Sequence, residues 1–265
     1  MTSEAKSQAV SMLWWRSLCI LALLNICLWT AIWIFTPAPN LYTSLQIGLS
    51  GVYVFVCAYR SIFPRVDLER FVVVDSAASS IFWGRSAATI AEICFGIQLG
   101  LLVYQLGLHA GLPWVQHAAW GITLFTIIAQ VFCWHSILTL NHITQAVEEL
   151  LWAAGLSWMA ALLMIVAMNS EGILQTLAGA GILVSLVFVA YVLILDVPMY
   201  VKRFRHSRGA GHKVLSITEG IQDARDRREH KLDWKHWQDD ALWLTPYFSI
   251  GVWISMGMIF VPFLI

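Results

Sequence analysis

Seven long apolar runs separated by short polar connections dominate the pattern of the chain. A helix that crosses a bilayer needs about 20 mostly apolar residues. Runs of this kind lie at residues 15–35, 41–58, 87–106, 114–138, 150–168, 173–195 and 241–265. The pattern therefore predicts an all-α fold, a polytopic helix bundle with seven transmembrane helices. Because no internal repeat or low-complexity tract interrupts it, we interpret residues 1–265 as a single transmembrane domain.

The placement of lysine and arginine predicts the orientation of this bundle. In a seven-span arrangement the basic residues fall on one side: Lys6 and Arg16, four arginines within residues 60–85, and ten lysines and arginines within residues 202–235. The opposite connections, PAPN, HAGLP and MNSEG, carry none. Since basic residues concentrate in cytoplasmic loops, we expect a cytoplasmic amino terminus and an external carboxyl terminus. A six-span alternative, with the second or third run in the interface, would scatter the basic residues over both faces.

Composition agrees with a lipid environment. Hydrophobic residues make up 59% of the chain and charged residues 12%, too few charges for an ordinary water-exposed surface. Lysine plus arginine equals aspartate plus glutamate at 16 each, which argues against a nucleic-acid partner. We expect a multi-pass protein of the bacterial inner (plasma) membrane whose partners are membrane lipid and a hydrophobic small molecule. Association into a homo-oligomer is left open.

Two polar segments on the predicted cytoplasmic side are long enough to have structure. Residues 59–85 are too polar to span, so they are predicted to form a short interfacial helix or turn. Residues 202–240 form a charged, amphipathic segment, within which Ser216 and Glu219 match a capping box. Beyond Ser216 the pattern is that of a charged helix continuing to Asp240, or of a merely solvated charge run.

Glu92 is the ionisable residue that lies deepest in a predicted span. A charge inside a membrane is costly, so such a residue marks either a function or a polar contact to another helix. Arg85 and Thr89 share its helix face, because seven residues are close to two turns. We expect Arg85 to reach only partway, leaving Glu92 to meet Asn141, His142 or Glu149.

A second group of polar residues surrounds the start of the fifth predicted helix. Asn141 or Thr144 is expected to cap that helix, which places Glu148 and Glu149 in its first two turns. His135 and His142, with Glu92 and Glu149, could form an imidazole–carboxylate metal site, but no H-x-x-x-H or E-x-x-H spacing supports one. The metal content and any cofactor are therefore left unknown.

The sixth predicted helix carries Asp196, followed by Pro198. Proline removes a backbone donor, so the helix is predicted to bend or end here. Several tryptophans, Trp237 among them, are expected to anchor at the membrane interface. The seventh predicted helix contains no lysine, which excludes a retinal Schiff base. The chain contains no nucleophile elbow, Walker A motif or dinucleotide-binding glycine pattern.

These residues favour a membrane-embedded enzyme, of isomerase or cyclase type, acting on a lipid or isoprenoid-like substrate by carboxylate acid/base chemistry at the cytoplasmic mouth. In this hypothesis Glu92 is the general acid, and Asp196 or Glu149 the base. The candidate catalytic residues are Arg85, Glu92, Asn141, His142, Glu148, Glu149 and Asp196. In size and span number the chain resembles integral membrane terpene cyclases and sterol isomerases, an architectural resemblance without a shared motif. The alternatives are a proton-coupled carrier, or a non-catalytic assembly subunit that docks through the charged segment.

Overall fold

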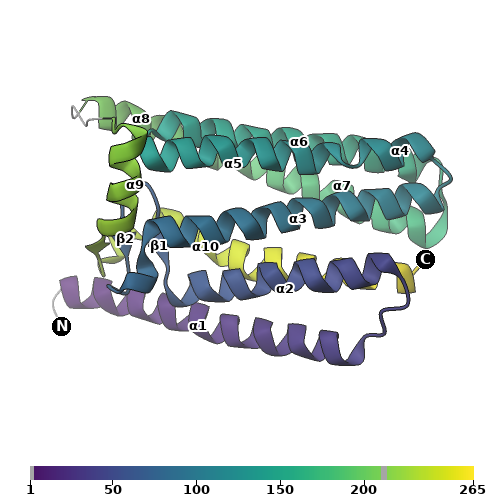
Figure 1. Cartoon of the computed structure of the whole chain (residues 1–265), viewed down its shortest axis with the longest axis horizontal. Coiled ribbons are helices and arrows are strands. Elements are labelled where there is room, and N and C mark those ends of the chain that lie inside the picture. Colours follow the sequence, from purple (N-terminus) through teal and green to yellow (C-terminus); the bar gives the residue numbers. More distant parts are fainter. Residues whose placement is uncertain (1–2, 210–213) are drawn as a thin grey trace. The chain divides into compact units, whose positions relative to one another are not determined.

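Seven helical segments long and apolar enough to cross a membrane are present in the computed structural model, which describes residues 3–209 and 214–265 (Figure 1). They are Ser3–Phe35, Leu41–Ile62, Ile81–His109, Pro113–Thr139, His142–Met168, Gly172–Gly209 and Gln238–Phe263. The prediction of an all-α fold with seven apolar helices is confirmed. By helix length and hydropathy the chain is a multi-pass integral membrane protein. The orientation of its termini stays a prediction.

Several helices are longer than the apolar runs that predicted them. Helix α1 (Ser3–Phe35) begins 12 residues before the predicted start at residue 15, and α6 (His142–Met168) begins 8 residues before residue 150. A hydropathy pattern marks the part of a helix that suits lipid, whereas backbone hydrogen bonding continues into flanking polar residues. In α1 and α6 the apolar run therefore lies within a longer helix, and α6 begins directly after Asn141, one of its two predicted caps.

The chain divides into two compact units. Unit 1 comprises Met1–Cys94 and Ile221–Ile259, and unit 2 comprises Phe95–Gly220 and Phe260–Ile265. Helices α3 (Ile81–His109) and α9 (Ile217–Asp226) contribute residues to both units, as does the short 3₁₀-helix Met258–Phe263. Each unit is described by itself below.

In unit 1, α1 packs along α2 (Leu41–Ile62), and α2 also contacts α11 (Val252–Gly257). Asn40 caps α2, its side chain accepting a hydrogen bond from the Thr43 N–H at 2.8 Å. The segment from α10 (Gln238–Pro246) through a π-helix (Tyr247–Gly251) to α11 completes the unit. Polar side chains reach backbone carbonyls there, for example the Tyr42 hydroxyl donating to the Met258 carbonyl at 2.9 Å.

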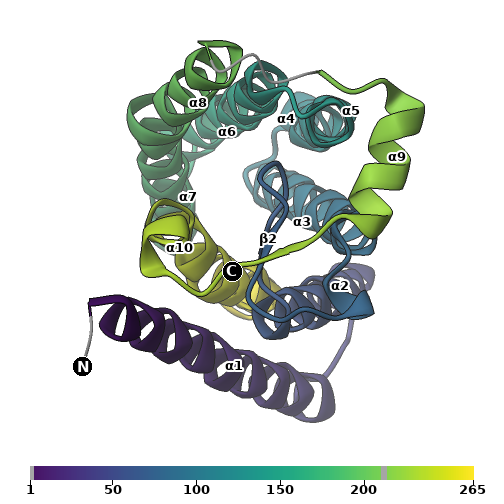
Figure 2. The ribbon, with the colours of Figure 1, turned by 90° about the vertical axis from the view of Figure 1, so that its left-hand side faces the viewer.

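At one end of unit 1, the chain after α2 forms a small sheet. Strands β1 (Arg65–Val66) and β2 (Phe71–Val72) make an antiparallel hairpin, and β3 (Glu229–His230) pairs with β2 in parallel. Two short 3₁₀-helices, Ala77–Ser79 and Trp234–His236, follow β2 and β3. Figure 2 shows the start of α1 beside α10 at this end, where the Trp14 indole donates to Thr245. The hairpin is thus held in unit 1 by its pairing with β3.

Each polar segment was given two alternatives, and in each the helical alternative was wrong. Between α2 and α3 the chain forms the hairpin, with a turn at residues 67–70, and a 3₁₀-helix, because strand pairing with β3 holds the chain extended. A charged helix does not continue to Asp240, since α9 ends at Asp226 and β3 follows. The capping box is confirmed, because the Ser216 N–H donates to the Glu219 carboxylate and the Glu219 N–H to the Ser216 hydroxyl. Residues 210–213 of the charged segment 202–240 lie outside the described residues.

Trp237 is not an interfacial anchor. Its side chain is fully buried beside Val66 and Val73, and Trp14 and Trp234 pack against it. Burial of a ring this large removes far more apolar surface from water than a membrane-interface position would. Trp237 therefore belongs to the core that holds the hairpin in unit 1.

In unit 2, α6 packs between α5 (Gly121–Thr139) and α7 (Gly172–Tyr191). Helix α4 (Pro113–Ala118) precedes α5, and a π-helix (Val192–Asp196) joins α7 to α8 (Val197–Gly209). The sixth helix therefore continues past Pro198, and the predicted possibility that it ends there was wrong. A π-turn absorbs the irregularity in backbone hydrogen bonding without breaking the helix.

Candidate functional site

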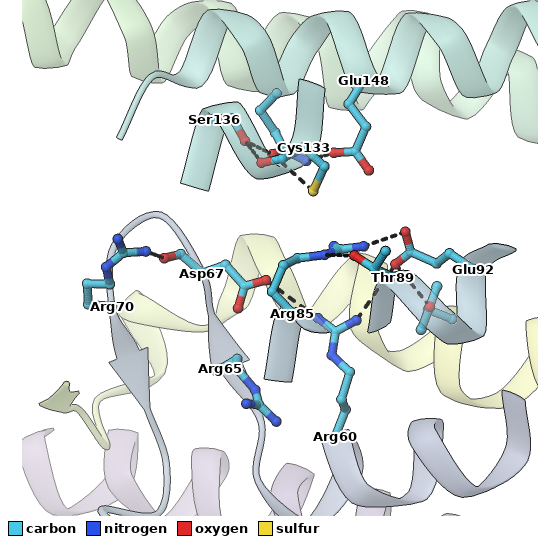
Figure 3. A network of polar contacts seen from close by, with 12 residues as sticks. Arg60, Arg65, Asp67, Arg70, Arg85, Thr89, Glu92, Cys133, Ser136 and Glu148 are labelled. Atoms are coloured by element: carbon cyan, nitrogen blue, oxygen red, sulfur yellow. Dashed lines mark hydrogen bonds and ion pairs between the residues drawn. The ribbon is translucent and has the colours of Figure 1, made fainter. Parts of the chain in front are cut away.

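Six charged residues from the end of α2, the hairpin and the start of α3 form what we call the arginine cluster of unit 1 (Figure 3). Its members are Arg60, Arg65, Asp67, Arg70, Arg85 and Glu92. The four arginines and Glu92 are all buried. Because buried charges are costly unless compensated, the contacts within this cluster decide what it can do.

Glu92 is the centre of the cluster. Its Oε2 lies 2.5 Å from Arg85 Nη2, its Oε1 lies 3.9 Å from Arg60 Nη1, and the Tyr247 hydroxyl donates to Oε1 at 3.2 Å. Glu92 as a whole is 6% exposed. One carboxylate oxygen is therefore held by a short charge-assisted bond, while the other faces a phenol and a second guanidinium.

The expectation that Arg85 reaches only partway to Glu92 was wrong. The two residues are seven apart, which is about 10 Å of helix rise. An arginine and a glutamate on one face together have enough length to close this distance, and Thr89 between them lies 3.5 Å from Arg85 Nε. Local helix geometry alone therefore brings together two of the predicted catalytic residues.

Arg60 lies near two carboxylates but forms a hydrogen bond with neither. Its guanidinium lies 4.0 Å from Asp67 Oδ2 and 3.9 Å from Glu92 Oε1, and both separations exceed hydrogen-bond length. Its carbon Cζ also lies 5.7 Å from the ring centre of Tyr247. Within the described part of the chain, the buried Arg60 Nε has no hydrogen-bond partner.

Arg65 carries a buried charge without an adjacent counterion. Its Nη1 donates to the Ser80 carbonyl at 2.7 Å, and its guanidinium lies 4.9 Å from the ring centre of Tyr59. Among the described residues no carboxylate lies within 4 Å of it, and its Nε and Nη2 have no partner. Burial, and then the like charge of Arg60, lower the pKa of Arg65.

Arg70 ties the hairpin to the chain around α9. It has a left-handed backbone, φ 63°, and its Nε lies 2.8 Å from Asp223 Oδ2. Its Nη1 donates to the Asp67 carbonyl, and its own carbonyl accepts from the Glu229 N–H at 2.8 Å. Burial lowers the pKa of Arg70, and the bond to Asp223 opposes that shift. These contacts hold the hairpin against β3.

Tyr247 is a site residue that the sequence analysis missed. It begins the π-helix Tyr247–Gly251 directly after Pro246, and its ring packs 5.7 Å from that of Tyr53. Short π-helical turns in otherwise α-helical segments frequently occur at functional sites. A proline inside the seventh apolar run was the available signal, because it predicts an irregular backbone at that point.

The polar residues of unit 2 form a second group, at the start of α6. Of the two predicted caps, Asn141 is the one that caps α6, its side chain accepting from the Ile143 N–H at 3.1 Å. Gln145 donates to Glu148 and accepts from the Ser136 hydroxyl at 2.5 Å. Glu149 is buried in the same turn. This group supports the helix start and leaves Glu148 hydrogen-bonded.

Asp196 and His142 have aromatic neighbours in the same unit. Asp196 ends the π-helix Val192–Asp196, and its Oδ1 accepts from the Tyr191 hydroxyl at 3.3 Å. The His142 ring stacks on that of Tyr200, with centres 6.5 Å apart. Both π-helices in the described residues thus carry a buried hydrogen-bonding side chain at one end, Tyr247 in unit 1 and Asp196 in unit 2.

The predicted site residues are therefore divided between the two units. Arg85 and Glu92 belong to unit 1, and Asn141, His142, Glu148, Glu149 and Asp196 belong to unit 2. That the two sets meet stays a prediction. Within the residues that the structure describes, no group of three or more histidine, cysteine, aspartate or glutamate side chains is placed to hold a metal ion. Comparison with protein-family models, curated proteins and solved structures gives no match.

Proposed function

We propose that the protein is a membrane-embedded enzyme that transfers protons on a lipid or isoprenoid-like substrate, with Glu92 and Tyr247 as its reacting pair. The observation that carries the proposal is the Glu92 carboxylate, buried in an apolar helix with a phenol 3.2 Å from one oxygen and a guanidinium 2.5 Å from the other. With a cytoplasmic amino terminus, this pair lies toward the cytoplasmic end of the third span.

The two guanidiniums change the role expected of Glu92. Because Arg85 and Arg60 lie beside the Glu92 carboxylate, we assign Glu92 the role of proton acceptor from Tyr247 instead of the general acid of the sequence hypothesis. In the proposed step the Tyr247 oxygen accepts a proton from the substrate while its own proton passes to Glu92 Oε1. Return of a proton to another substrate atom restores both groups and isomerises the substrate.

Solvent deuterium tests this proposal without knowledge of the substrate. Protein in nanodiscs is incubated with a bacterial lipid extract in D₂O, and lipids are analysed by mass spectrometry. We expect one lipid class to gain deuterium with the wild-type protein, and Glu92→Gln and Tyr247→Phe to lower the rate by about 10²-fold or more. Tyr42→Phe is the matched control, since it removes another buried phenol hydroxyl that donates to a carbonyl of unit 1.

Correct folding of each variant is checked by its melting temperature in the same nanodiscs. If folded Glu92→Gln and wild-type protein give equal deuterium incorporation in every lipid class, proton transfer through Glu92 is refuted. The proton-coupled carrier is the second candidate, because the same buried carboxylate could take up and release protons during transport. Proton uptake coupled to substrate accumulation in sealed vesicles, without deuterium in the substrate, would favour it.

A further inference from the structure

Arg65 presents one complete edge of its guanidinium without a protein partner. The Nε–H and the Nη2–H that lies beside it form the edge on which arginine binds an oxyanion through two parallel hydrogen bonds. Within the described residues neither nitrogen has a hydrogen-bond partner, whereas Nη1 on the other edge donates to Ser80. Figure 3 draws Arg65 with no contact to the other residues shown. The unbonded groups are therefore the pair suited to an oxyanion.

The position of this edge is fixed by the surrounding chain. The Arg65 side chain lies against Gly84, where an added Cβ would fall 1.5 Å from Nη1. Tyr59 lies on one face of the guanidinium, and the Ser80 carbonyl holds Nη1. A guanidinium held in this way loses little freedom when it binds, so its edge is organised in advance for a ligand.

Charge also favours an anion over water at this edge. Glu92 is paired with Arg85 and Asp223 with Arg70, and Asp67 lies 4.0 Å from Arg60. Arg65 has no carboxylate within 4 Å in the described part of the chain. A water molecule could satisfy two N–H groups but not a buried positive charge. Arg60, with an unpartnered Nε of its own, adds a second positive charge to the same region.

We propose that Arg65, assisted by Arg60, binds the phosphate-type headgroup of an anionic amphiphile. This inference rests on the proposed function and names its substrate class: the headgroup oxyanion is held at the hairpin, and the apolar tail lies along the lipid-facing part of unit 1. The edge is covered in the structure, so the side chains over it move aside when the headgroup binds, while Arg65 keeps its contacts with the Ser80 carbonyl and the Tyr59 ring.

Lipid binding to the purified protein in detergent, measured by native mass spectrometry, tests the proposal. The probes are phosphatidic acid, phosphatidylcholine with the same acyl chains, and inorganic phosphate. We expect the wild-type protein to prefer phosphatidic acid over phosphatidylcholine by about tenfold, as one bidentate charge-assisted contact allows. Arg65→Gln should reduce this preference to about twofold or less, and Arg65→Lys should restore only part of it, because lysine keeps the charge without the edge.

Matched variants separate the site from general effects. Gly84→Ala keeps every charge but displaces the Arg65 guanidinium, so it should lower the preference as Arg65→Gln does. Gly48→Ala, in an open position of α2, and Arg16→Gln, an exposed basic residue, should leave the preference unchanged.

Three results would overturn the proposal: a wild-type protein without preference, folded Arg65→Gln with the wild-type preference, or displacement of phosphatidic acid by equimolar inorganic phosphate. The last would assign the edge to a free anion. If a variant fails to fold, the headgroup preference of the wild-type protein still tests the proposal. Because binding is measured without turnover, loss of the headgroup preference and loss of deuterium exchange are separate results.

Discussion

Replacement of Arg70 tests how the hairpin is held in unit 1. This residue combines two features that oppose each other energetically, a buried ion pair with Asp223 at 2.8 Å and a left-handed backbone with φ 63°. The ion pair formed by the arginine side chain stabilises the folded state. The left-handed backbone destabilises it by about 1–2 kcal/mol for a residue other than glycine. Alanine and glycine at position 70 separate the two contributions.

The expected loss in the free energy of unfolding follows from how deeply Arg70 and Asp223 are buried. Removing one partner of a fully buried ion pair costs about 3–5 kcal/mol. Asp223 is 18% exposed and keeps Arg227 at 3.7 Å, so we expect the lower limit, about 3 kcal/mol, for Arg70→Ala. Glycine loses the same pair but relieves the left-handed strain, and should cost about 1 kcal/mol less than alanine.

Hydrogen exchange at the paired strands provides the local assay. The amides of Glu229 and Lys231 donate to the carbonyls of Arg70 and Val72, so their protection reports opening of the hairpin from β3. We expect Arg70→Ala to exchange about fivefold faster than Arg70→Gly, and both faster than wild type. Arg225→Ala, an exposed arginine of α9, should behave as wild type. Equal protection in all variants, or slower exchange in Arg70→Ala than in Arg70→Gly, would refute the reasoning.

Two further predictions concern orientation and packing. In a cysteine-free background, cysteine at Ser170 should react with an impermeant reagent from outside and cysteine at Ser207 only after permeabilisation, and the opposite pattern would reverse the predicted topology. Gly220→Ala should lower the free energy of unfolding by about 1–3 kcal/mol, because its Cβ would lie 1.9 Å from the Leu138 carbonyl oxygen. Gly179→Ala, in open space, should instead leave stability unchanged or raise it by up to about 1 kcal/mol, as melting temperatures would show.

The spans could be predicted because the signal for them is local. Twenty consecutive apolar residues satisfy the requirement of the bilayer whatever the rest of the chain does. The hairpin could not be predicted in the same way. Strand β2 of the hairpin pairs Phe71 with Glu229 of β3. A strand of two residues is too short for its sequence to show a periodic pattern. The extended conformation of residues 71–72 is decided by a partner far along the chain.

The candidate site shows the same division between local and distant contacts. Arg85 and Glu92 lie on one helix face, so helical periodicity was enough to relate them. Tyr247 lies 155 residues from Glu92, and Arg60 belongs to another helix. Their approach depends on how the helices pack, which no spacing in the sequence specifies. Only the irregularity at Pro246 pointed toward Tyr247.

Burial of charge alone does not distinguish a structural cluster from a functional one. The contacts of Glu92 with Arg85 and Tyr247 offset the desolvation cost of burying its charge in an apolar helix. A purely structural cluster would require no further contact to Glu92. Such a cluster would be expected to close its remaining contacts, since each unsatisfied buried donor costs about 1–3 kcal/mol. Arg60 instead lies 3.9 Å and 4.0 Å from its two carboxylates, and Arg65 keeps an unbonded edge. These incomplete contacts, more than the buried charges themselves, favour a ligand at the arginine cluster.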